Sequence, residues 1–296
     1  MKLLTYRIKH SGEDYRVGVL LDDMIYSVEG LKKYISDPLC KESLTGHPAD
    51  FYRKLAHALP ALEAALCSAN PLDGISKENV EYGPVVTAPS KIICVGVNYM
   101  DHVKEMGHDV PKLPVLFSKF SNALIGHLDD IMGKEKSHQL DYEVELACVI
   151  GKTCMEVKES EALDYILGYT IANDISARDL QKRTSQWLQG KTLDRSTPIG
   201  PYIVTSDEIL DPGQLKIRSF VNGECRQDSS TSQLIFNIPT LIAFISNLMT
   251  LEPGDIILTG TPHGVGFAKK PPQLLHSGDE VICEISGIGK LVNKVK

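Results

Sequence analysis

Residues 141–150 read DYEVELACVI, with three acidic residues at alternate positions followed by an unbroken apolar run. Side chains alternate between the two faces of a strand, so Asp141, Glu143 and Glu145 would share one face. The apolar run predicts a strand that is buried on both faces. Carboxylates on a buried face repel one another unless a cation or protons neutralise them. The pattern indicates a site for a hard divalent cation such as Mg²⁺ or Mn²⁺, with an acidic strand edge in solvent as the alternative.

Further strands are predicted on both sides of this stretch. Runs rich in β-branched residues, separated by Gly, Pro and Asp, occur at residues 92–97, 146–150, 202–205, 215–221, 255–259 and 280–285. Asn222-Gly223 is a strong hairpin signal, and one clear helix is predicted near residues 239–251. The spacing lacks the strand–helix alternation of a doubly wound sheet. It predicts a strand-dominated α+β fold, in which residues 89–296 form a mixed β-roll or barrel.

The pattern of the first 88 residues predicts a smaller α+β domain, in which we recognise no catalytic or binding motif. Residues 4–8 and 15–21 alternate like the two strands of a hairpin. Apolar residues at helical spacing follow Asp50, a candidate helix cap, and Pro60 would kink or split that helix. Residues 68–90 are rich in Asn, Pro, Gly and Ser, so we place a domain boundary near residue 88.

Composition narrows the class of protein. Of the 296 residues, 43% are hydrophobic and 23% are charged, which excludes general disorder. The net charge is −7 and there is no run of basic residues, which argues against a nucleic-acid partner. No apolar run has the ~20 residues of a membrane helix, so we expect no membrane partner, and the beginning of the chain resembles neither a signal nor a transit peptide. Seven scattered cysteines without a CxxC pair indicate a reducing cytosol, so we expect a cytoplasmic protein.

Other polar side chains could complete a site around the acidic strand. Residues 169–174 read YTIAND, a strand that ends in a polar pair. Asp174 would supply a third carboxylate, with a helix cap as the alternative. His102 and Glu105 are three residues apart and would share one face of a helix. There they would form a general-base dyad, or else an ordinary surface pair.

Two further features suit an anionic ligand. Arg178 and Lys191 could neutralise a negatively charged substrate, or lie in solvent as most such residues do. Residues 258–266 read LTGTPHGVG, where the glycines allow close approach of the backbone and the hydroxyl and amide groups can hold a carboxylate. This loop has neither the Walker ending nor a GxGxxG pattern, and a tight turn between strands is its alternative.

The order of these motifs resembles the fumarylacetoacetate hydrolase family across about residues 90–296. The matching motifs are GxNYxxHxxE from Gly96, DYExEL from Asp141, GYxxxNDxxxRD from Gly168, Gly190-Lys191, VNG from Val221 and PGDxIxTGTPxGVG from Pro253. Each motif alone is moderately specific, whereas their joint occurrence in this order is highly specific. Within the family, the chain most resembles the branch of fumarylacetoacetate hydrolase domain-containing protein 2 and its bacterial relatives.

The resemblance implies a mixed β-roll catalytic domain of this family's C-terminal type, in a homodimer with one Mg²⁺ or Mn²⁺ ion per subunit. It implies that the metal is bound by Glu143, Glu145 and Asp174. It also implies that His102, Glu105 and Lys191 are catalytic. The substrate would be bound by Arg178, Gln181, Lys191 and Thr261. Asp141 matches no ligand position of the family, so it is given no role in the site.

The resemblance also implies an enzyme that acts on small anionic 2-oxo acids through an enolate stabilised by the metal. Hydrolysis of a C–C bond in acylpyruvates and decarboxylation of oxaloacetate are the leading expectations. Oxaloacetate keto–enol tautomerisation and 2-hydroxyhepta-2,4-diene-1,7-dioate-type isomerisation are the alternatives, because they share the enolate. A non-catalytic metabolite-binding scaffold is the alternative from another class. The chain departs from the founding hydrolases, which bring a fourth carboxylate to the metal, and this argues against fumarylacetoacetate itself as the substrate.

Overall fold

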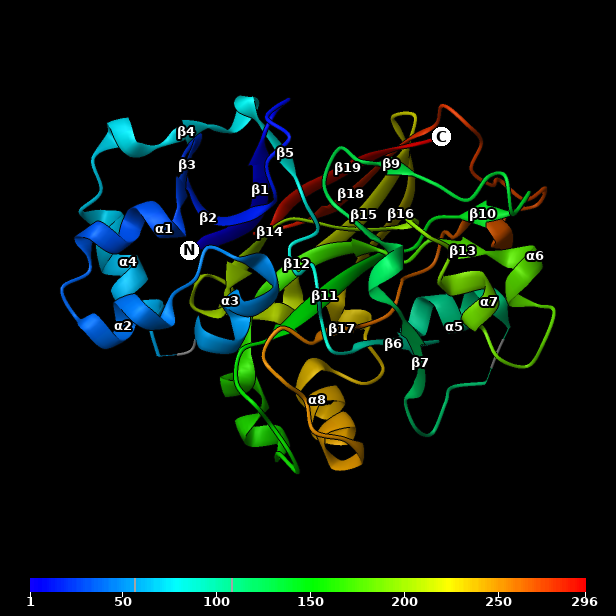
Figure 1. Ribbon diagram of the computed structural model, residues 1–296. Coiled ribbons are helices and arrows are strands. Elements are labelled where there is room, and N and C mark those ends of the chain that lie inside the picture. The colour runs from blue at the N-terminus through cyan, green and yellow to red at the C-terminus, as the bar shows by residue number, and fades with distance from the viewer. Residues whose placement is uncertain (56, 108) are drawn as a thin grey trace.

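The protein is described from a computed structural model covering residues 1–55, 57–107 and 109–296, and strands dominate it (Figure 1). A large mixed sheet runs through the molecule. From edge to edge its strands are β4 (Ile75–Ser76), β3 (Met24–Ser27), β2 (Arg16–Leu21), β1 (Lys2–Ile8), β14 (Thr197–Thr205), β12 (Ile166–Asn173), β11 (Val144–Ile150), β17 (Ile256–Leu258), β6 (Ile92–Gly96) and β7 (Val115–Lys119). Two short strands join it from the side, β5 (Val80–Tyr82) on β1 and β8 (Leu124–Ile125) on β14. The predicted strand-dominated α+β fold is confirmed.

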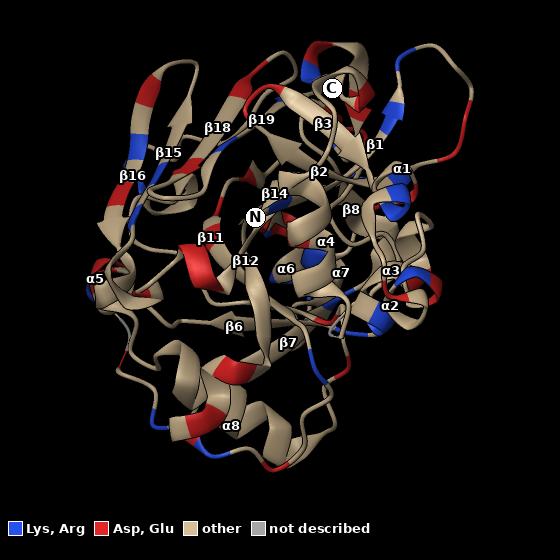
Figure 2. Ribbon diagram, turned by 90° about the vertical axis from the view of Figure 1, so that its left-hand side faces the viewer, with Lys and Arg blue, Asp and Glu red and all other residues tan. Residues whose placement is uncertain are grey.

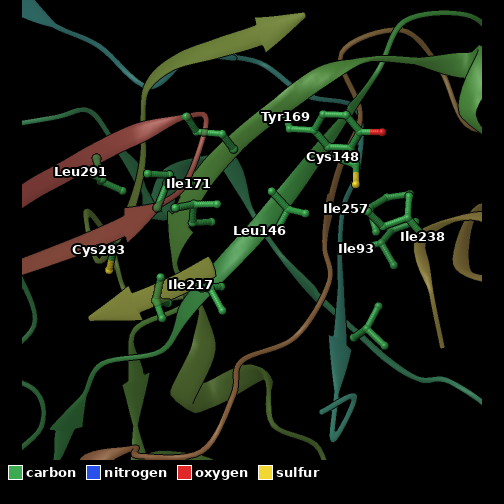
Figure 3. Close-up of a cluster of buried hydrophobic side chains, with 14 of the residues drawn as sticks. Ile93, Leu146, Cys148, Tyr169, Ile171, Ile217, Ile238, Ile257, Cys283 and Leu291 are labelled. Atoms are coloured by element: carbon green, nitrogen blue, oxygen red, sulfur yellow. The ribbon is translucent and has the colours of Figure 1, made fainter. Parts of the chain in front are cut away.

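A second sheet packs against the middle of the first. Its strands, in spatial order, are β16 (Glu224–Ser230), β15 (Lys216–Val221), β18 (Glu280–Ile285), β19 (Gly289–Val295) and β9 (Asp130–Ile131). The hairpin predicted at Asn222-Gly223 is confirmed, because β15 and β16 pair antiparallel on either side of it. Leu146, Ile171 and Ile217 meet between the two sheets and belong to the main hydrophobic core (Figure 3). Acidic and basic residues are interspersed along β15, β16 and β18 (Figure 2).

β11 and β12 lie at the centre of the large sheet, and every residue of both strands is buried. The prediction of a central strand is confirmed for residues 144–150. Its predicted start is wrong, because Asp141 belongs to the separate short strand β10 (Leu140–Asp141) and residues 142–143 lie between the two strands. β11 and β12 pair antiparallel, with Val144 opposite Asn173. Because of this register, the start of β11 adjoins the end of β12, and residues about thirty positions apart in the sequence become neighbours.

Short helices gather beside this junction. In chain order they are α5 (Met100–Met106), α6 (Arg178–Gln181) and α7 (Leu188–Lys191), near the small ladder of β10 (Leu140–Asp141) with β13 (Ser176–Ala177) (Figure 1). The longer helix α8 (Ile238–Leu248) matches the helix predicted near residues 239–251 and covers another part of the core.

The N-terminal strands extend the large sheet. The hairpin predicted for residues 4–21 is confirmed as β1 and β2, and β1 also pairs with β14 from the later part of the chain. Beside them lie α1 (Val28–Leu31), α2 (Pro38–Ser43), α3 (Pro48–Leu55) and α4 (Leu59–Cys67) (Figure 1). The domain boundary near residue 88 stays a prediction.

The helix predicted after Asp50 is interrupted as Pro60 requires. α3 ends at Leu55 and α4 begins at Leu59, with Pro60 in its first turn, while Ala56 lies outside the described residues. Proline is tolerated in a first turn because the amide that it lacks has no partner there. The prediction of Asp50 as the helix cap is wrong, because Pro48 starts α3 and places Asp50 inside the first turn.

Candidate functional site

The predicted site residues converge on one cavity of about 370 Å³. Its walls come from the start of β11, the end of β12, and the helices α5, α6 and α7. Eight of the nine predicted residues line it: His102, Glu143, Glu145, Asp174, Arg178, Gln181, Lys191 and Thr261. The ninth, Glu105, lies behind His102 and contacts it. Tertiary structure thus brings together side chains that span 160 positions of the sequence.

Three buried carboxylates meet where β11 and β12 adjoin. Glu143 directly precedes β11, Glu145 lies within it, and Asp174 directly follows β12. One oxygen from each carboxylate lies within 4.8 Å of the others. The backbone holds this corner, because the Asp174 N–H donates to the Glu143 carbonyl at 2.9 Å. The helix-cap alternative for Asp174 is not what the structure shows, since α6 begins at Arg178 without a side-chain cap.

The pKa values of the two glutamates shift in opposite directions because their partners differ. Burial tends to raise the pKa of Glu143, but the adjacent Arg178 and Lys191 cations outweigh it and hold that pKa well below its usual range. Burial and the neighbouring Asp174 carboxylate raise the pKa of Glu145 well above its usual range. A backbone N–H, that of Gly260, donates to Glu145 at 2.8 Å. Within the described residues no ion pair joins Glu145 to a Lys, Arg or His side chain.

This donor set fits a hard divalent cation. Carboxylate oxygens are the ligands that such ions prefer, and a dication among the three groups would relieve the repulsion that raises the pKa of Glu145. Glu143, Glu145 and Asp174 would hold the ion and leave its remaining positions open toward the cavity.

Two buried lysines neutralise part of this acidic cluster. The Lys191 Nζ donates to Glu143 Oε2 and Asp174 Oδ2, at 2.5 Å in each case. Lys119, at the end of β7, donates to Asp174 Oδ1 at 2.7 Å, and its side chain is fully buried. Sequence reasoning missed Lys119, because a lysine in a short strand is ordinarily a solvent-exposed residue. The one available signal was its position between two phenylalanines, Phe117 and Phe120.

A glycine explains how Lys191 reaches the carboxylates. A Cβ on Gly190 would lie 2.5 Å from the Cβ of Gln181 and 2.6 Å from the Ala177 carbonyl oxygen. The absence of a side chain therefore lets α7 approach α6 closely. This contact explains physically why the Gly190-Lys191 pair accompanies the site.

Arg178 is held in the cavity wall by Asp141. The Arg178 Nε and Nη2 donate to Asp141 Oδ2 at 2.9 and 2.8 Å, and Nη2 also donates to Glu143 Oε1 at 2.6 Å. The other oxygen of Asp141 accepts the Gly266 N–H at 2.7 Å, which ties in the loop of residues 258–266. Asp141 thus positions an arginine and a loop, whereas the motif comparison gave it no role. The Arg178 Nη1 donates to Gln181 at 3.1 Å, so Gln181 belongs to the same network.

His102 and Glu105 form the expected pair on α5. The His102 Nδ1 lies 3.2 Å from Glu105 Oε2, with the two side chains only 13% and 20% exposed. Burial tends to raise the pKa of Glu105, but the contact with His102 and the N–H of Gly264 outweigh it and lower that pKa. The low exposure of the two side chains argues against an ordinary surface pair. His102 also lines the cavity.

Thr261 is positioned by a buried glutamine that sequence reasoning also missed. The Thr261 hydroxyl donates to the Val144 carbonyl at 3.0 Å and accepts from Gln227 Nε2 at 2.8 Å. Gln227 also accepts the Val144 N–H at 3.1 Å, so it joins β16 to the start of β11. No local pattern distinguishes Gln227 from the exposed polar residues around it on β16.

Comparison with known proteins identifies the class. The sequence profile of the Fumarylacetoacetate (FAA) hydrolase C-terminal family matches residues 91–296, and the chain belongs to this family. The rat (Rattus norvegicus) protein named Oxaloacetate tautomerase Fahd2a, mitochondrial, is 48% identical over 80% of this chain and 76% of its own length. The Fumarylacetoacetate hydrolase domain-containing protein 2 homolog of Dictyostelium discoideum is 42% identical over 100% of this chain and 97% of its own. The resemblance predicted from the motifs is confirmed.

Solved structures share the fold over the whole chain. The fumarylacetoacetate hydrolase of Exiguobacterium antarcticum has a TM-score of 0.79 and 35% identity, with 100% of this chain and 99% of its own covered. The maleylpyruvate hydrolase of Sphingobium sp. SYK-6, solved in complex with manganese(II) and pyruvate, has a TM-score of 0.77 and 30% identity, with coverage of 100% and 98%. The predicted family fold is therefore confirmed, and the family includes a member that binds a divalent metal.

The predicted cytoplasmic location is wrong by this comparison, because the name of the rat relative and those of the human and bovine relatives specify the mitochondrion. The prediction depended partly on free cysteines, and all seven are free in the structure. A free thiol reports a reducing environment, which is not unique to the cytosol. In the described part of the chain, no helix combines the length and the hydropathy needed to cross a membrane.

Proposed function

We propose that this protein is a divalent-metal-dependent oxaloacetate keto–enol tautomerase. The observation that carries the proposal is the cavity in which three buried carboxylates, three cations and the His102–Glu105 pair converge. Relatives at 42–48% identity, of which the rat protein is named an oxaloacetate tautomerase, support this choice among the reactions that share an enolate. A cavity of this size, lined by cations as well as carboxylates, also suits a short, anionic 2-oxo acid.

The metal would be Mg²⁺ or Mn²⁺, one per subunit, on Glu143, Glu145 and Asp174. When bound, such an ion polarises a 2-oxo group and stabilises the negative charge of an enolate. The chain's own residues orient the substrate. The Gln181 side-chain N–H would donate to a substrate oxygen, and the Thr261 hydroxyl would do so by turning away from the Val144 carbonyl. Lys191 would supply a positive charge beside the developing enolate.

His102 would carry the proton. Glu105 accepts from the His102 Nδ1, which orients the ring and leaves Nε2 for the substrate. In the enol-to-keto direction, the unprotonated Nε2 would take the proton of the enol hydroxyl on C2, and the imidazolium so formed would give it to C3. The number of protons is conserved, no C–C bond breaks and no co-reactant is consumed.

Hydrolysis of a C–C bond is the second candidate. The same His102–Glu105 pair would activate water for attack on a distal carbonyl, and a structural relative over the whole chain is named a maleylpyruvate hydrolase. Decarboxylation of oxaloacetate would also proceed through the enolate. From the family resemblance we further propose that the active form is a homodimer, which sedimentation equilibrium would test.

The deciding experiment follows the enol absorbance of oxaloacetate and the release of pyruvate in parallel, with Mg²⁺ and with EDTA. The tautomerase predicts metal-dependent decay of the enol signal without pyruvate. Pyruvate release at the same rate would instead establish decarboxylation, and cleavage of acetylpyruvate would establish hydrolysis. His102→Ala should retain metal binding and lose about 10²–10⁴-fold in turnover. His138→Ala, at an exposed position outside the cavity lining, is the matched control, and equal activity of both variants would remove His102 from the mechanism.

A further inference from the structure

The cations that line the cavity differ in whether a carboxylate already neutralises them. Arg178 is paired with Asp141 and Glu143, and Lys191 with Glu143 and Asp174. The third lining cation, Lys182, makes no ion pair within the described residues. It is therefore the lining cation whose charge is available to a ligand.

Lys182 lines the same cavity as the three carboxylates, although its side chain is exposed. It directly follows α6, and its N–H donates to the Arg178 carbonyl at 3.3 Å. Its Nζ lies 3.4 Å from the centre of the Phe267 ring, and the Arg178 guanidinium carbon lies 5.9 Å from the same ring. Partial loss of solvent around the Lys182 ammonium and the charge of Arg178 both lower the pKa of Lys182, which agrees with this proximity. The ring holds the ammonium at the cavity wall by a cation–π contact.

The segment that carries Lys182 is anchored at its far end. The Trp187 ring packs edge-on against Phe117, with 5.3 Å between ring centres. It also covers Gly96, where an added Cβ would lie 2.4 Å from the indole. This contact, together with the start of the segment in α6, holds residues 182–187 at the cavity mouth, which reduces the entropy lost when Lys182 binds a ligand.

The formal charge of the lining indicates the charge of the ligand. The carboxylates Glu143, Glu145 and Asp174 contribute −3, and the lining cations Arg178, Lys182 and Lys191 contribute +3, so the sum is zero with His102 neutral. A divalent ion raises the sum to +2, which a substrate with two carboxylates neutralises. Without Lys182 the sum would be +1, which suits a monocarboxylate.

We propose that Lys182 is the specificity-determining residue that binds the second, distal carboxylate of the substrate and so selects dicarboxylic 2-oxo acids over monocarboxylic ones. This inference rests on the proposed function for its chemistry, since the head of the substrate is assigned to the metal side of the cavity. Phe267 and Lys182 form the distal side. A methyl group in place of the distal carboxylate would meet the ring without using the charge.

The test measures binding, so it does not depend on turnover. Calorimetry with Mg²⁺ present gives the dissociation constants of 2-oxoglutarate and 2-oxopentanoate, which have the same chain length and differ by one carboxylate. Wild-type protein should prefer 2-oxoglutarate, and Lys182→Gln should weaken 2-oxoglutarate about five- to tenfold with 2-oxopentanoate unchanged. Lys182→Arg should restore the preference. Arg183→Gln removes the next charge, which does not line the cavity, and should have no effect.

An unchanged ratio of the two dissociation constants in Lys182→Gln would overturn the inference, whether both ligands bind as in the wild type or both are weakened equally. A wild-type preference that depends on Lys182, in a protein without tautomerase activity, would support the inference while refuting the proposed function. Where turnover is present, Lys182→Gln should raise the KM for oxaloacetate by the same factor and leave kcat within about twofold.

Discussion

Replacement of Asp141 by Asn tests whether this buried carboxylate supports the site without binding the metal. Asp141 is fully buried and accepts both the Nε and Nη2 of Arg178, together with the backbone N–H groups of Gly266 and Phe267. The amide of Asn would keep one acceptor oxygen but present N–H donors toward the guanidinium. Arg178 would then lose one of its two carboxylate partners and much of its orientation.

The magnitude follows from the burial of this ion pair. Removal of one partner from a buried pair costs about 3–5 kcal/mol, because the other charge stays in a medium of low polarity. For a chain of 296 residues, an unfolding entropy of about 2.1 cal/mol/K per residue gives roughly 0.6 kcal/mol/K. The melting temperature should therefore fall by about 5–8 °C.

The assay combines thermal unfolding with Mn²⁺ binding and enol turnover. We expect Asp141→Asn to melt earlier and to lose activity, with metal affinity within about threefold of wild type, because the three carboxylates remain. Asp255→Asn is the matched control: Asp255 is equally buried and paired with Lys91, but it lies outside the cavity lining. It should lower stability and leave turnover intact. Loss of metal binding in Asp141→Asn would refute the reasoning and make Asp141 a ligand.

Three other predictions concern the metal, the pH and the packing. Glu143→Gln should weaken Mn²⁺ binding more than about 100-fold by calorimetry, and wild-type affinity would break the ligand assignment. Burial lowers the pKa of His127 from 6.5 to about 4, so on acidification the unfolded chain binds this proton before the folded protein does. The free energy of unfolding should therefore keep its full His127 contribution above pH 6.5 and fall by up to about 3 kcal/mol as the pH drops through 4. His127→Asn should flatten this dependence in urea titrations at pH 7 and 4.5, and an unchanged slope would contradict the assignment. Gly190→Ala should cost about 1–3 kcal/mol and raise the KM for oxaloacetate, because its Cβ would overlap Gln181; an unaffected variant would show that α7 can shift freely.

Local pattern was sufficient for much of the architecture. The apolar run after the acidic residues identified β11, the Asn222-Gly223 turn identified the β15–β16 hairpin, and Pro60 marked the break between two helices. These signals depend on side-chain periodicity and on backbone chemistry within a few residues, so no knowledge of distant contacts was needed. Errors stayed at element ends, as with Asp50, where one neighbouring proline changed the first helical residue.

The amino-acid sequence by itself determined the strand-dominated class, the order of the motifs and the kinds of side chain available for a site. Only the tertiary structure decided which of these side chains meet and what each one neutralises. It paired Asp141 with Arg178, placed the buried Lys119 against Asp174 and left Lys182 without an acidic partner in the described chain. The physical reason is that an ion pair depends on distances between chain segments, which are set by strand register and helix packing rather than by any pattern along one segment.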